Sequence, residues 1–309
     1  MKVIYDRKNW NEEAVVATVG FFDGVHPGHR FLIRAMRTLA REQQLPTAII
    51  TFPKHPGVVL RPDYRPKVLN SFEEKMELLA TTGIDYVIVI DFTTTLATFT
   101  AQAFITTVLV PEWKVKVLFV GYDHRFGFQR AEGFEKYLVY GQLCGMEVVS
   151  VSSFNNDQGV AVSSSMIRSL IENGEMTVVS SLLGYHYQIK GQVVNGQHVG
   201  RQLGFPTANL IVDEKFKVIP RNGLYAVRII INEQKYYGVL YIGLRPTIEY
   251  DDSLRIEVNI FEFSKDIYDE SIVVEFIDFI REDRKFDSFV ELREQMKKDK
   301  AIALQLIHK

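Results

Sequence analysis

Several features that define whole classes of protein are scarce in this sequence. Its 309 residues include a single cysteine, Cys144, so no disulfide can form within the chain, and this usage suits a reducing compartment. No apolar run approaches the length of a membrane span, and residues 1–11 are polar and charged, unlike a secretory signal. We therefore expect a cytoplasmic protein that has no membrane partner.

The sequence also lacks an excess of either positive or negative charge. The formal net charge is −2, from 36 lysines and arginines against 38 aspartates and glutamates, and no long basic run is present. Nucleic acid is therefore not expected as a main partner, and no obligatory protein partner is evident. Repeats and low-complexity segments are missing as well, whereas the length is comfortable for two globular domains.

The first half of the chain alternates apolar strand segments with amphipathic helices. Strands are expected at residues 14–19, 47–52, 86–90, 115–120 and 146–151, and helices at 31–43, 72–82, 100–110 and 134–143. Continuously apolar strands separated by helices predict an α/β fold whose parallel sheet is covered on both faces. Ligands of such sheets bind at the carboxyl ends of the strands.

The pattern changes after Gly184. Strands broken by turns are expected at residues 187–194, 225–231, 235–242, 254–261 and 272–279, which predicts a small antiparallel barrel. A closing helix is expected from Ser288 to His308, with Ser288-x-x-Glu291 as its cap. We therefore predict two domains, residues 1–183 and 184–309.

A glycine-rich turn joins the first predicted strand to its helix, where residues 18–30 read Thr-Val-Gly-Phe-Phe-Asp-Gly-Val-His-Pro-Gly-His-Arg. Gly20 and Gly24 allow a tight bend and a close approach to a ligand. Gly28 and His29 stand at the start of the helix, where free backbone N–H groups and the helix dipole favour an anion. The two histidines, His26 and His29, can donate hydrogen bonds to phosphate oxygens. The chain has no Gly-Lys pair, which excludes a P-loop, and its glycine spacing is wrong for a dinucleotide fingerprint. An ordinary turn with two surface histidines stays open.

Three further segments follow predicted strands or begin a helix. Residues 51–57 form a loop stiffened by two prolines, and residues 121–133 combine three glycines with arginines and aromatics that suit a flat ring and phosphates. Residues 163–165 are serines before a helix, with Arg168 one turn later, a pattern that suits a triphosphate. The alternatives are a plain connection for residues 51–57, a surface loop for residues 121–133 and a simple N-cap for residues 163–165.

The second half carries a glycine-rich stretch and an alternating strand. Four glycines between residues 191 and 204 indicate a flap with close backbone approach to a ligand. Thr207 and Asn209 are two residues apart, so in an extended chain both oxygens point the same way and can reach a hard cation. In residues 254–260, Glu257 lies on the polar face, for which ordinary solvation is the alternative.

Together these motifs resemble the bifunctional riboflavin kinase/FAD synthetase family. The His-x-Gly-His at residues 26–29 resembles the nucleotidyltransferase signature, and the string from Gly20 to His29 is similar to its version in that family. The resemblance extends from about Val16 to Lys300, in the family's order. It implies a Rossmann-like nucleotidyltransferase domain, a riboflavin kinase barrel, ATP as substrate, Mg²⁺ as cofactor, and riboflavin, FMN and FAD as ligands.

The resemblance also implies roles for individual residues. It implies catalytic roles for Glu257, as the base for the ribityl hydroxyl, and for His26, His29 and Arg168. It implies nucleotide binding by Gly20, Phe21, Asp23, Gly24, Gly28, Ser164, Ser165, Gly191, Gly200 and Arg201. It implies flavin binding by Phe52, His55, Pro56, Asp123, Arg125, Phe126 and Arg281, and Mg²⁺ binding by Thr207 and Asn209. The sequence departs from the family at His124, usually phenylalanine, and at Asn259, usually histidine.

Two other functions stay open at this point. One is a nucleotidyltransferase for another phosphorylated acceptor, such as pantetheine phosphate or a nicotinamide nucleotide; the kinase signature in the second half argues against it. The other is a flavin-binding regulatory protein, against which the intact His-x-Gly-His, Pro-Thr-Ala-Asn and Glu257 argue.

Overall fold

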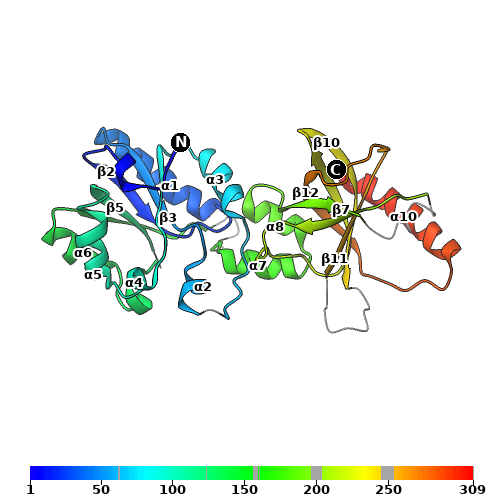
Figure 1. The fold of residues 1–309 in the computed structure, drawn as a ribbon. Coiled ribbons are helices and arrows are strands. Elements are labelled where there is room, and N and C mark those ends of the chain that lie inside the picture. Colours follow the sequence, from blue (N-terminus) through cyan, green and yellow to red (C-terminus); the bar gives the residue numbers. More distant parts are fainter. Residues whose placement is uncertain are drawn as a thin grey trace. The chain divides into compact units, whose positions relative to one another are not determined.

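A computed structural model describes residues 1–61, 63–122, 124–155, 159, 161–195, 204–244 and 254–308. Its backbone divides into two compact units, Met1–Ser164 and Ser165–Lys309, and Figure 1 shows the elements of each. The two units are defined by the compactness of the backbone and not by function, so the predicted domain boundary between residues 183 and 184 stays a prediction.

The first unit is built on a six-stranded sheet with the order β1-β4-β3-β2-β5-β6. All five strand pairs are parallel, as the alternation of strands and helices predicts. The strands are β1 (Lys2–Ile4), β2 (Val15–Val19), β3 (Thr47–Thr51), β4 (Tyr86–Val89), β5 (Val115–Gly121) and β6 (Glu147–Val151). The edge strand β1 is not predicted from the sequence, because three residues with an exposed Lys2 make no apolar run.

Helices cover both faces of this sheet (Figure 1). The α-helices are α1 (Pro27–Glu42), α2 (Pro56–Leu60), α3 (Phe72–Ala80), α4 (Thr94–Ala97), α5 (Ala101–Ala103) and α6 (Phe134–Leu143). Short 3₁₀ turns are η1 (Arg7–Asn9) and η3 (Phe128–Arg130), and η2 (Phe104–Leu109) is a π-helix that continues α5. The helix predicted at residues 100–110 is therefore α5 followed by one wider π-helical segment.

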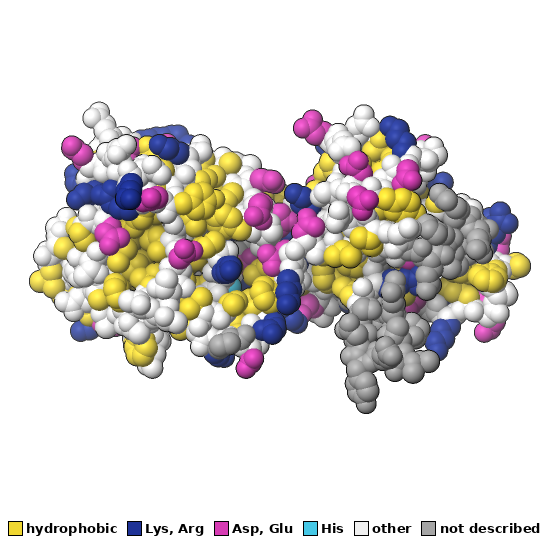
Figure 2. Space-filling view, viewed as in Figure 1, with side chains coloured by type: hydrophobic (Ala, Val, Ile, Leu, Met, Phe, Trp, Pro, Cys, Tyr) yellow, Lys and Arg dark blue, Asp and Glu magenta, His cyan; other side chains and the backbone are white. Residues whose placement is uncertain are grey.

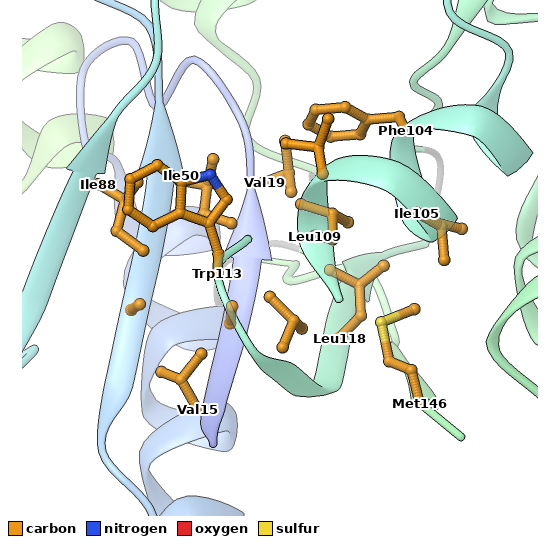
Figure 3. Packing of buried hydrophobic residues seen from close by; sticks show 14 of the residues in the cluster. Val15, Val19, Ile50, Ile88, Phe104, Ile105, Leu109, Trp113, Leu118 and Met146 are labelled. Carbon is orange, nitrogen blue, oxygen red and sulfur yellow. The ribbon is translucent and has the colours of Figure 1, made fainter. Parts of the chain in front are cut away.

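The core of the first unit has two layers because the strands are buried on both sides. Val15 and Val19 of β2 face one cluster, which the residues of η2 and α6 complete, and Figure 3 shows Phe104 and Leu109 of η2 beside the sheet. Val16 faces the opposite cluster, which α1 and α3 cover. Alternate side chains of one strand point to opposite faces, so a strand with two buried faces must be apolar throughout.

The second unit contains a closed antiparallel barrel with the order β10-β11-β8-β7-β12-β9. Its strands are β7 (Gln188–Val194), β8 (Ala208–Val212), β9 (Gly223–Ile231), β10 (Gln234–Leu244), β11 (Leu254–Ile260) and β12 (Ser271–Arg281). Its helices are α7 (Ser164–Glu172), α8 (Met176–Leu183), which packs on β12, and α10 (Phe289–Ile307). The predicted barrel with a closing helix is therefore confirmed.

A buried ion pair joins the closing helix to the barrel. Arg281, at the end of β12, donates two hydrogen bonds to Asp299 of α10, at 3.0 Å from Nε and 2.9 Å from Nη2. Asp299 is only 2 % exposed and also accepts a 2.8 Å bond from Gln295. A bidentate arginine–carboxylate pair is directional as well as strong, so it fixes where α10 lies on the barrel.

The described helices and the visible surface are mixed in character. Among the residues that the structure describes, none of the helices combines the length and the apolar character that crossing a bilayer requires. In Figure 2 basic, acidic and apolar side chains are intermixed over the visible face, in keeping with the small net charge.

We expect Asp299→Ala to destabilise the barrel unit by about 3–5 kcal/mol, because removal of one partner leaves a half-buried guanidinium without its counter-charge. Urea unfolding of the full chain followed by far-UV circular dichroism measures the loss. Both tryptophans, Trp10 and Trp113, lie in the first unit, so its fluorescence transition should not move.

The matched control is Lys297→Ala, which breaks the exposed pair with Glu294 on the same helix. Exposed pairs contribute little, so this variant should unfold with the parent. Equal effects of the two substitutions would mean that the Arg281–Asp299 pair does not anchor the helix.

Candidate active sites

The loop between β2 and α1 has a strained backbone. Phe22, Gly24 and Val25 have φ angles of 55°, 84° and 37°. Glycine accepts such an angle freely, but a β-branched valine does so only where the surroundings impose it. Backbone strain of this kind concentrates at functional sites, where it fixes groups in position before a ligand arrives.

Contacts from distant segments hold this loop. The buried Asp23 accepts hydrogen bonds through Oδ1 from the backbone N–H groups of Leu69, at 2.9 Å, and Asn70, at 3.3 Å. Its carbonyl oxygen accepts a 2.9 Å bond from the hydroxyl of Ser164. Asp23 and Ser164, both predicted at the nucleotide site, therefore meet within the first unit, and Asp23 organises the loop through its own bonds.

His26 and His29 lie against each other at the start of α1. His26 occupies the N-cap position, and the two rings stack with centroids 3.8 Å apart and planes inclined by 23°. The Nδ1 atoms of both rings are buried and have no hydrogen-bond partner within the described part of the chain. Buried polar atoms are rarely left unpaired, and these two nitrogens suit the predicted contact with a phosphate, which stays a prediction.

Both histidines are uncharged at neutral pH. Burial lowers the pKa of His26 to about 4. The pKa of His29 lies well below its usual range, first because of burial and then because of electrostatic repulsion by His26, His124 and Lys75 when they are protonated. A neutral imidazole donates one hydrogen bond and accepts one, so the pair offers hydrogen bonds to a phosphate without adding charge.

The loop after β3 meets the loop after β2. Pro56 begins α2, and His55 caps this helix by accepting a 3.0 Å bond at Nδ1 from Gly57. The ring of Phe21 packs edge-on against the His55 ring with centroids 5.0 Å apart. Phe52, at 9 % exposure, packs into the core of the unit. Residues predicted for the nucleotide and for the flavin thus stand side by side.

A buried lysine that the sequence does not single out joins these two loops. Lys75 of α3 donates hydrogen bonds to the carbonyl oxygens of Phe21 and Phe52. Ser71 and Glu74 form a reciprocal capping box at the start of α3, and their Ser-x-x-Glu pattern is a local sequence signal, whereas a lysine in the first turns of a helix is usually solvent-exposed. The one local signal is that Lys75 directly follows the capping-box residue Glu74, in a helix that comes after a strand and its loop.

The loop after β5 contains three residues that are predicted to bind the flavin: Asp123, Arg125 and Phe126. Phe126 stacks on the buried ring of Tyr137, with centroids 4.3 Å apart, and its backbone N–H donates to the Tyr137 hydroxyl at 2.9 Å. The carbonyl of Arg125 accepts a 3.0 Å bond from Arg130. Asp123 lies outside the described residues. Flavin contacts by these residues stay predictions.

The predicted serine–arginine pair lies at the start of α7. Arg168 donates through Nη2 to the hydroxyl of Ser165 at 3.0 Å, so the two side chains are held together. Both belong to the second compact unit. The resemblance also implies that Ser164 and Arg168 surround one ATP together with His26 and His29, and this stays a prediction.

In the barrel, strand register brings the predicted kinase residues onto one face. Glu257 of β11 pairs directly with Asn209 of β8 and, on its other side, with Tyr241 of β10. Paired residues of antiparallel strands point to the same side, with Cβ atoms roughly 5 Å apart. Glu257 and Asn209 are therefore neighbours, which sequence spacing of nearly fifty residues cannot reveal.

Neighbouring groups hydrogen-bond to the paired side chains of Glu257 and Tyr241 and to the segments around them. Arg255 donates to Glu257 Oε1 from Nε at 2.8 Å and from Nη2 at 2.5 Å. The Tyr241 hydroxyl donates to Asp283 at 2.8 Å, and burial, followed by this bond, raises the pKa of Tyr241 to about 12. Asn259 donates to the carbonyl of Pro206 at 2.7 Å, so it ties β11 to the residue before Thr207.

A cavity of about 330 Å³ lies next to Thr207, on the side of the strands to which Ala208 and Val258 point and away from Asn209 and Glu257. Thr207, Val193 and Val258 line it together with residues 263–268. Its volume is at the small end of the range for small-molecule sites, and its wall is mixed apolar and polar. A predicted metal ligand thus stands at the edge of a cavity large enough for part of a nucleotide or a flavin.

Two predicted binding residues of the barrel have structural contacts. A Cβ atom at Gly191 would lie 2.2 Å from the carbonyl oxygen of Ile211, so the close approach of β7 and β8 requires glycine there. Arg281 is engaged by Asp299, as described above. Their ligand roles stay predictions, and Gly200 and Arg201 lie outside the described residues.

Comparison with known proteins identifies both halves of the chain. The family model described as FAD synthetase matches residues 8–166, and the one described as riboflavin kinase matches residues 183–307. The bifunctional riboflavin kinase/FMN adenylyltransferase of Escherichia coli (strain K12) is 36 % identical over 293 residues, which are 94 % of this chain and 92 % of that protein. The chain belongs to the bifunctional riboflavin kinase/FMN adenylyltransferase family.

A second relative and one solved structure are similar to this chain over nearly its whole length. The bifunctional riboflavin kinase/FMN adenylyltransferase of Listeria monocytogenes is 36 % identical over 305 residues, covering 97 % of this chain and 96 % of that one. A crystal structure named Macrolide-efflux Protein from Streptococcus pneumoniae has a TM-score of 0.87 and 32 % identity, with 97 % of each chain covered. The solved structure therefore has the same fold over nearly the whole of this chain.

We expect acid to destabilise the first unit through His26. Its folded-state pKa of about 4 lies below the ordinary value of 6.5, so the unfolded chain takes up the proton first as the pH falls. The stability that the neutral ring preserves above pH 6.5 is lost between 6.5 and 4, by roughly 3 kcal/mol. Tryptophan fluorescence during urea unfolding at pH 7 and pH 5 measures about 2 kcal/mol of this loss, because pH 5 lies about 1.5 pH units below the unfolded pKa.

His26→Gln removes the titrating ring and should lose less stability than the parent over the same pH interval. His308→Gln, at the exposed end of α10, is the control and should behave as the parent does. An identical pH dependence of parent and His26→Gln would show that His26 does not titrate with the depressed pKa.

Proposed function

We propose that this chain phosphorylates riboflavin to FMN in its barrel unit and adenylylates FMN to FAD in its parallel-sheet unit. One observation carries the proposal: the chain matches bifunctional relatives over nearly their whole length, with both family models present in order. The single cysteine and the use of ATP support a cytoplasmic location for both reactions.

In adenylyl transfer, a phosphate oxygen of FMN forms a bond to the α-phosphorus of ATP, and the bond to the departing pyrophosphate breaks. No protein nucleophile takes part. His26 and His29 donate hydrogen bonds to the α-phosphate oxygens, on which negative charge builds up. The strained loop holds both rings in place beforehand, so little reorganisation is needed in the transition state.

In the kinase reaction, the ribityl 5′-hydroxyl of riboflavin forms a bond to the γ-phosphorus of ATP, and ADP departs. Glu257 accepts the proton that leaves this hydroxyl. The two bonds from Arg255 to Oε1 hold the carboxylate in one orientation. The rest of the catalysis is positioning and charge neutralisation, which is usual for phosphoryl transfer.

The residues around Glu257 fit a magnesium ion. The Thr207 hydroxyl, the Asn209 amide oxygen and the Glu257 carboxylate are oxygen donors, which Mg²⁺ prefers, and the pairing of Asn209 with Glu257 puts two of them side by side. When bound there, the ion would neutralise the charge of the transferring phosphates. We therefore assign Thr207 and Asn209 as its holders.

The proposal predicts two successive products. The purified full chain, given riboflavin, ATP and Mg²⁺, should form FMN first and FAD after it, and given FMN in place of riboflavin should form FAD and pyrophosphate. Chromatography of samples taken over time resolves the flavins. Pantetheine phosphate and nicotinamide mononucleotide are the control acceptors and should yield no adenylylated product.

The two sites should fail separately. Glu257→Gln keeps the shape of the side chain but cannot accept a proton, so FMN formation should fall by about 10²–10⁴-fold while FAD formation from supplied FMN persists. His29→Ala removes a donor to the α-phosphate, so FAD formation should fall by about 10²–10³-fold while FMN formation persists. Initial rates of the two half-reactions measure both effects.

Each variant is the control for the other, because both units are present in each protein. A parallel loss of both activities in either variant would argue for misfolding or for a shared site. A fall of less than about tenfold in FMN formation by Glu257→Gln would remove Glu257 from the role of base.

A further inference from the structure

Lys75 is a buried cation in an unfavourable place. It lies near the amino terminus of α3, directly after the capping-box residue Glu74, and is only 3 % exposed. The helix dipole disfavours a positive charge at this end, and burial of an ammonium group without full hydrogen bonding is costly. A helix of this length has many exposed positions for a lysine, so its contacts must explain this one.

The ammonium group has three acceptors for its three protons. Nζ lies 3.1 Å from the carbonyl oxygen of Phe21, 3.0 Å from that of Phe52 and 3.2 Å from Oγ1 of Thr51. The rings of Phe21 and Phe72 face it at 4.3 Å and 5.3 Å from their centroids. Hydrogen bonds and cation–π contacts thus replace the water that burial removes.

The two carbonyls belong to different parts of the proposed adenylyltransferase site. Phe21 is in the loop that follows β2 and leads to His26 and His29. Phe52 is in the loop that follows β3 and leads to His55. One ammonium group therefore bridges the loop proposed for the ATP phosphates and the loop proposed for the flavin.

We propose that Lys75 is a positioning residue of the adenylyltransferase: it fixes the spacing of these two loops, and so the alignment of the FMN phosphate with the α-phosphate of ATP. The inference rests on the proposed function. Lys75 touches neither substrate, because its three protons are already donated to the protein. Its effect on the reaction runs through Phe21 and Phe52.

Electrostatics near Lys75 support this role. Burial lowers the pKa of Lys75 to about 8, and attraction by Asp23 opposes that shift, so the group is charged at neutral pH. Asp23 is the residue that holds the strained loop. The charge of Lys75 in turn helps to keep the pKa of His29 low. Lys75 thus interacts electrostatically both with Asp23, which holds the loop, and with His29, which follows the loop.

The test is Lys75→Met in the full chain, which keeps the apolar stem and removes the three donors. We expect kcat for FAD formation from FMN to fall by about 10²-fold, because a misplacement of about 1 Å has that effect on a reaction between two bound groups. The KM values for FMN and ATP should stay within about threefold, since each loop still binds its own substrate. Riboflavin kinase activity of the same protein should not change.

A single-turnover measurement separates positioning from a loss of folded protein. With enzyme in excess over FMN and with saturating ATP, all FMN converts at a rate constant that does not depend on a modest unfolded fraction. That rate constant should fall as kcat does. Lys136→Met, an exposed lysine on α6, is the matched control and should react as the parent does.

Three results would overturn the proposal: an unchanged single-turnover rate constant, a rise in one KM at unchanged kcat, or an equal loss of kinase activity. Should Lys75→Met lack the tryptophan unfolding transition, Lys75→Gln, which keeps a short uncharged donor, is judged by the same three criteria. Absence of FAD formation by the parent would instead overturn the proposed function, so the two failures are distinguishable.

Discussion

The first unit depends on holding one short loop in a conformation that its residues do not prefer. Val25 and Phe22 have positive φ angles, and the rings of His26 and His29 are stacked with their Nδ1 atoms unpaired. Buried polar groups from elsewhere in the chain stabilise this arrangement. Leu69, Asn70 and Ser164 donate hydrogen bonds to Asp23 and so hold the loop that leads to the histidines.

The two sites use different electrostatics. In the sheet unit the histidines are kept neutral by burial, so the site offers hydrogen bonds without positive charge on these rings. In the barrel unit, Arg255 and Glu257 form a pair on one strand, with a carboxylate near oxygen ligands that suit a cation. In the proposed function, the first arrangement would stabilise charge on a phosphate, and the second would remove a proton beside a metal ion.

Several residues that the resemblance assigns to ligands also have structural contacts. Arg281 fixes the closing helix through Asp299, Gly191 allows two strands to approach, and Asp23 holds the strained loop. Asn259, where the sequence departs from its family, bonds to the Pro206 carbonyl and so supports the segment that carries Thr207. Substitution at these positions therefore tests packing as well as binding.

Much of this protein follows from its sequence alone. Continuously apolar segments such as residues 15–19 determined the parallel sheet, and the alternation in residues 254–260 determined which face of the strand carries Glu257, because side-chain direction follows local periodicity. The order of motifs determined the family. Helix caps at Ser71 and Ser288 were equally local and are confirmed.

Tertiary structure alone decided what meets across long sequence separations. The pairing of Glu257 with Asn209, the bridge from Lys75 to Phe21 and Phe52, and the salt bridge between Arg281 and Asp299 each join residues that no local pattern relates. Burial of Lys75 and the lowered pKa values of the two histidines have the same origin. Desolvation depends on every element packed around a group, and a sequence specifies that packing only through the complete fold.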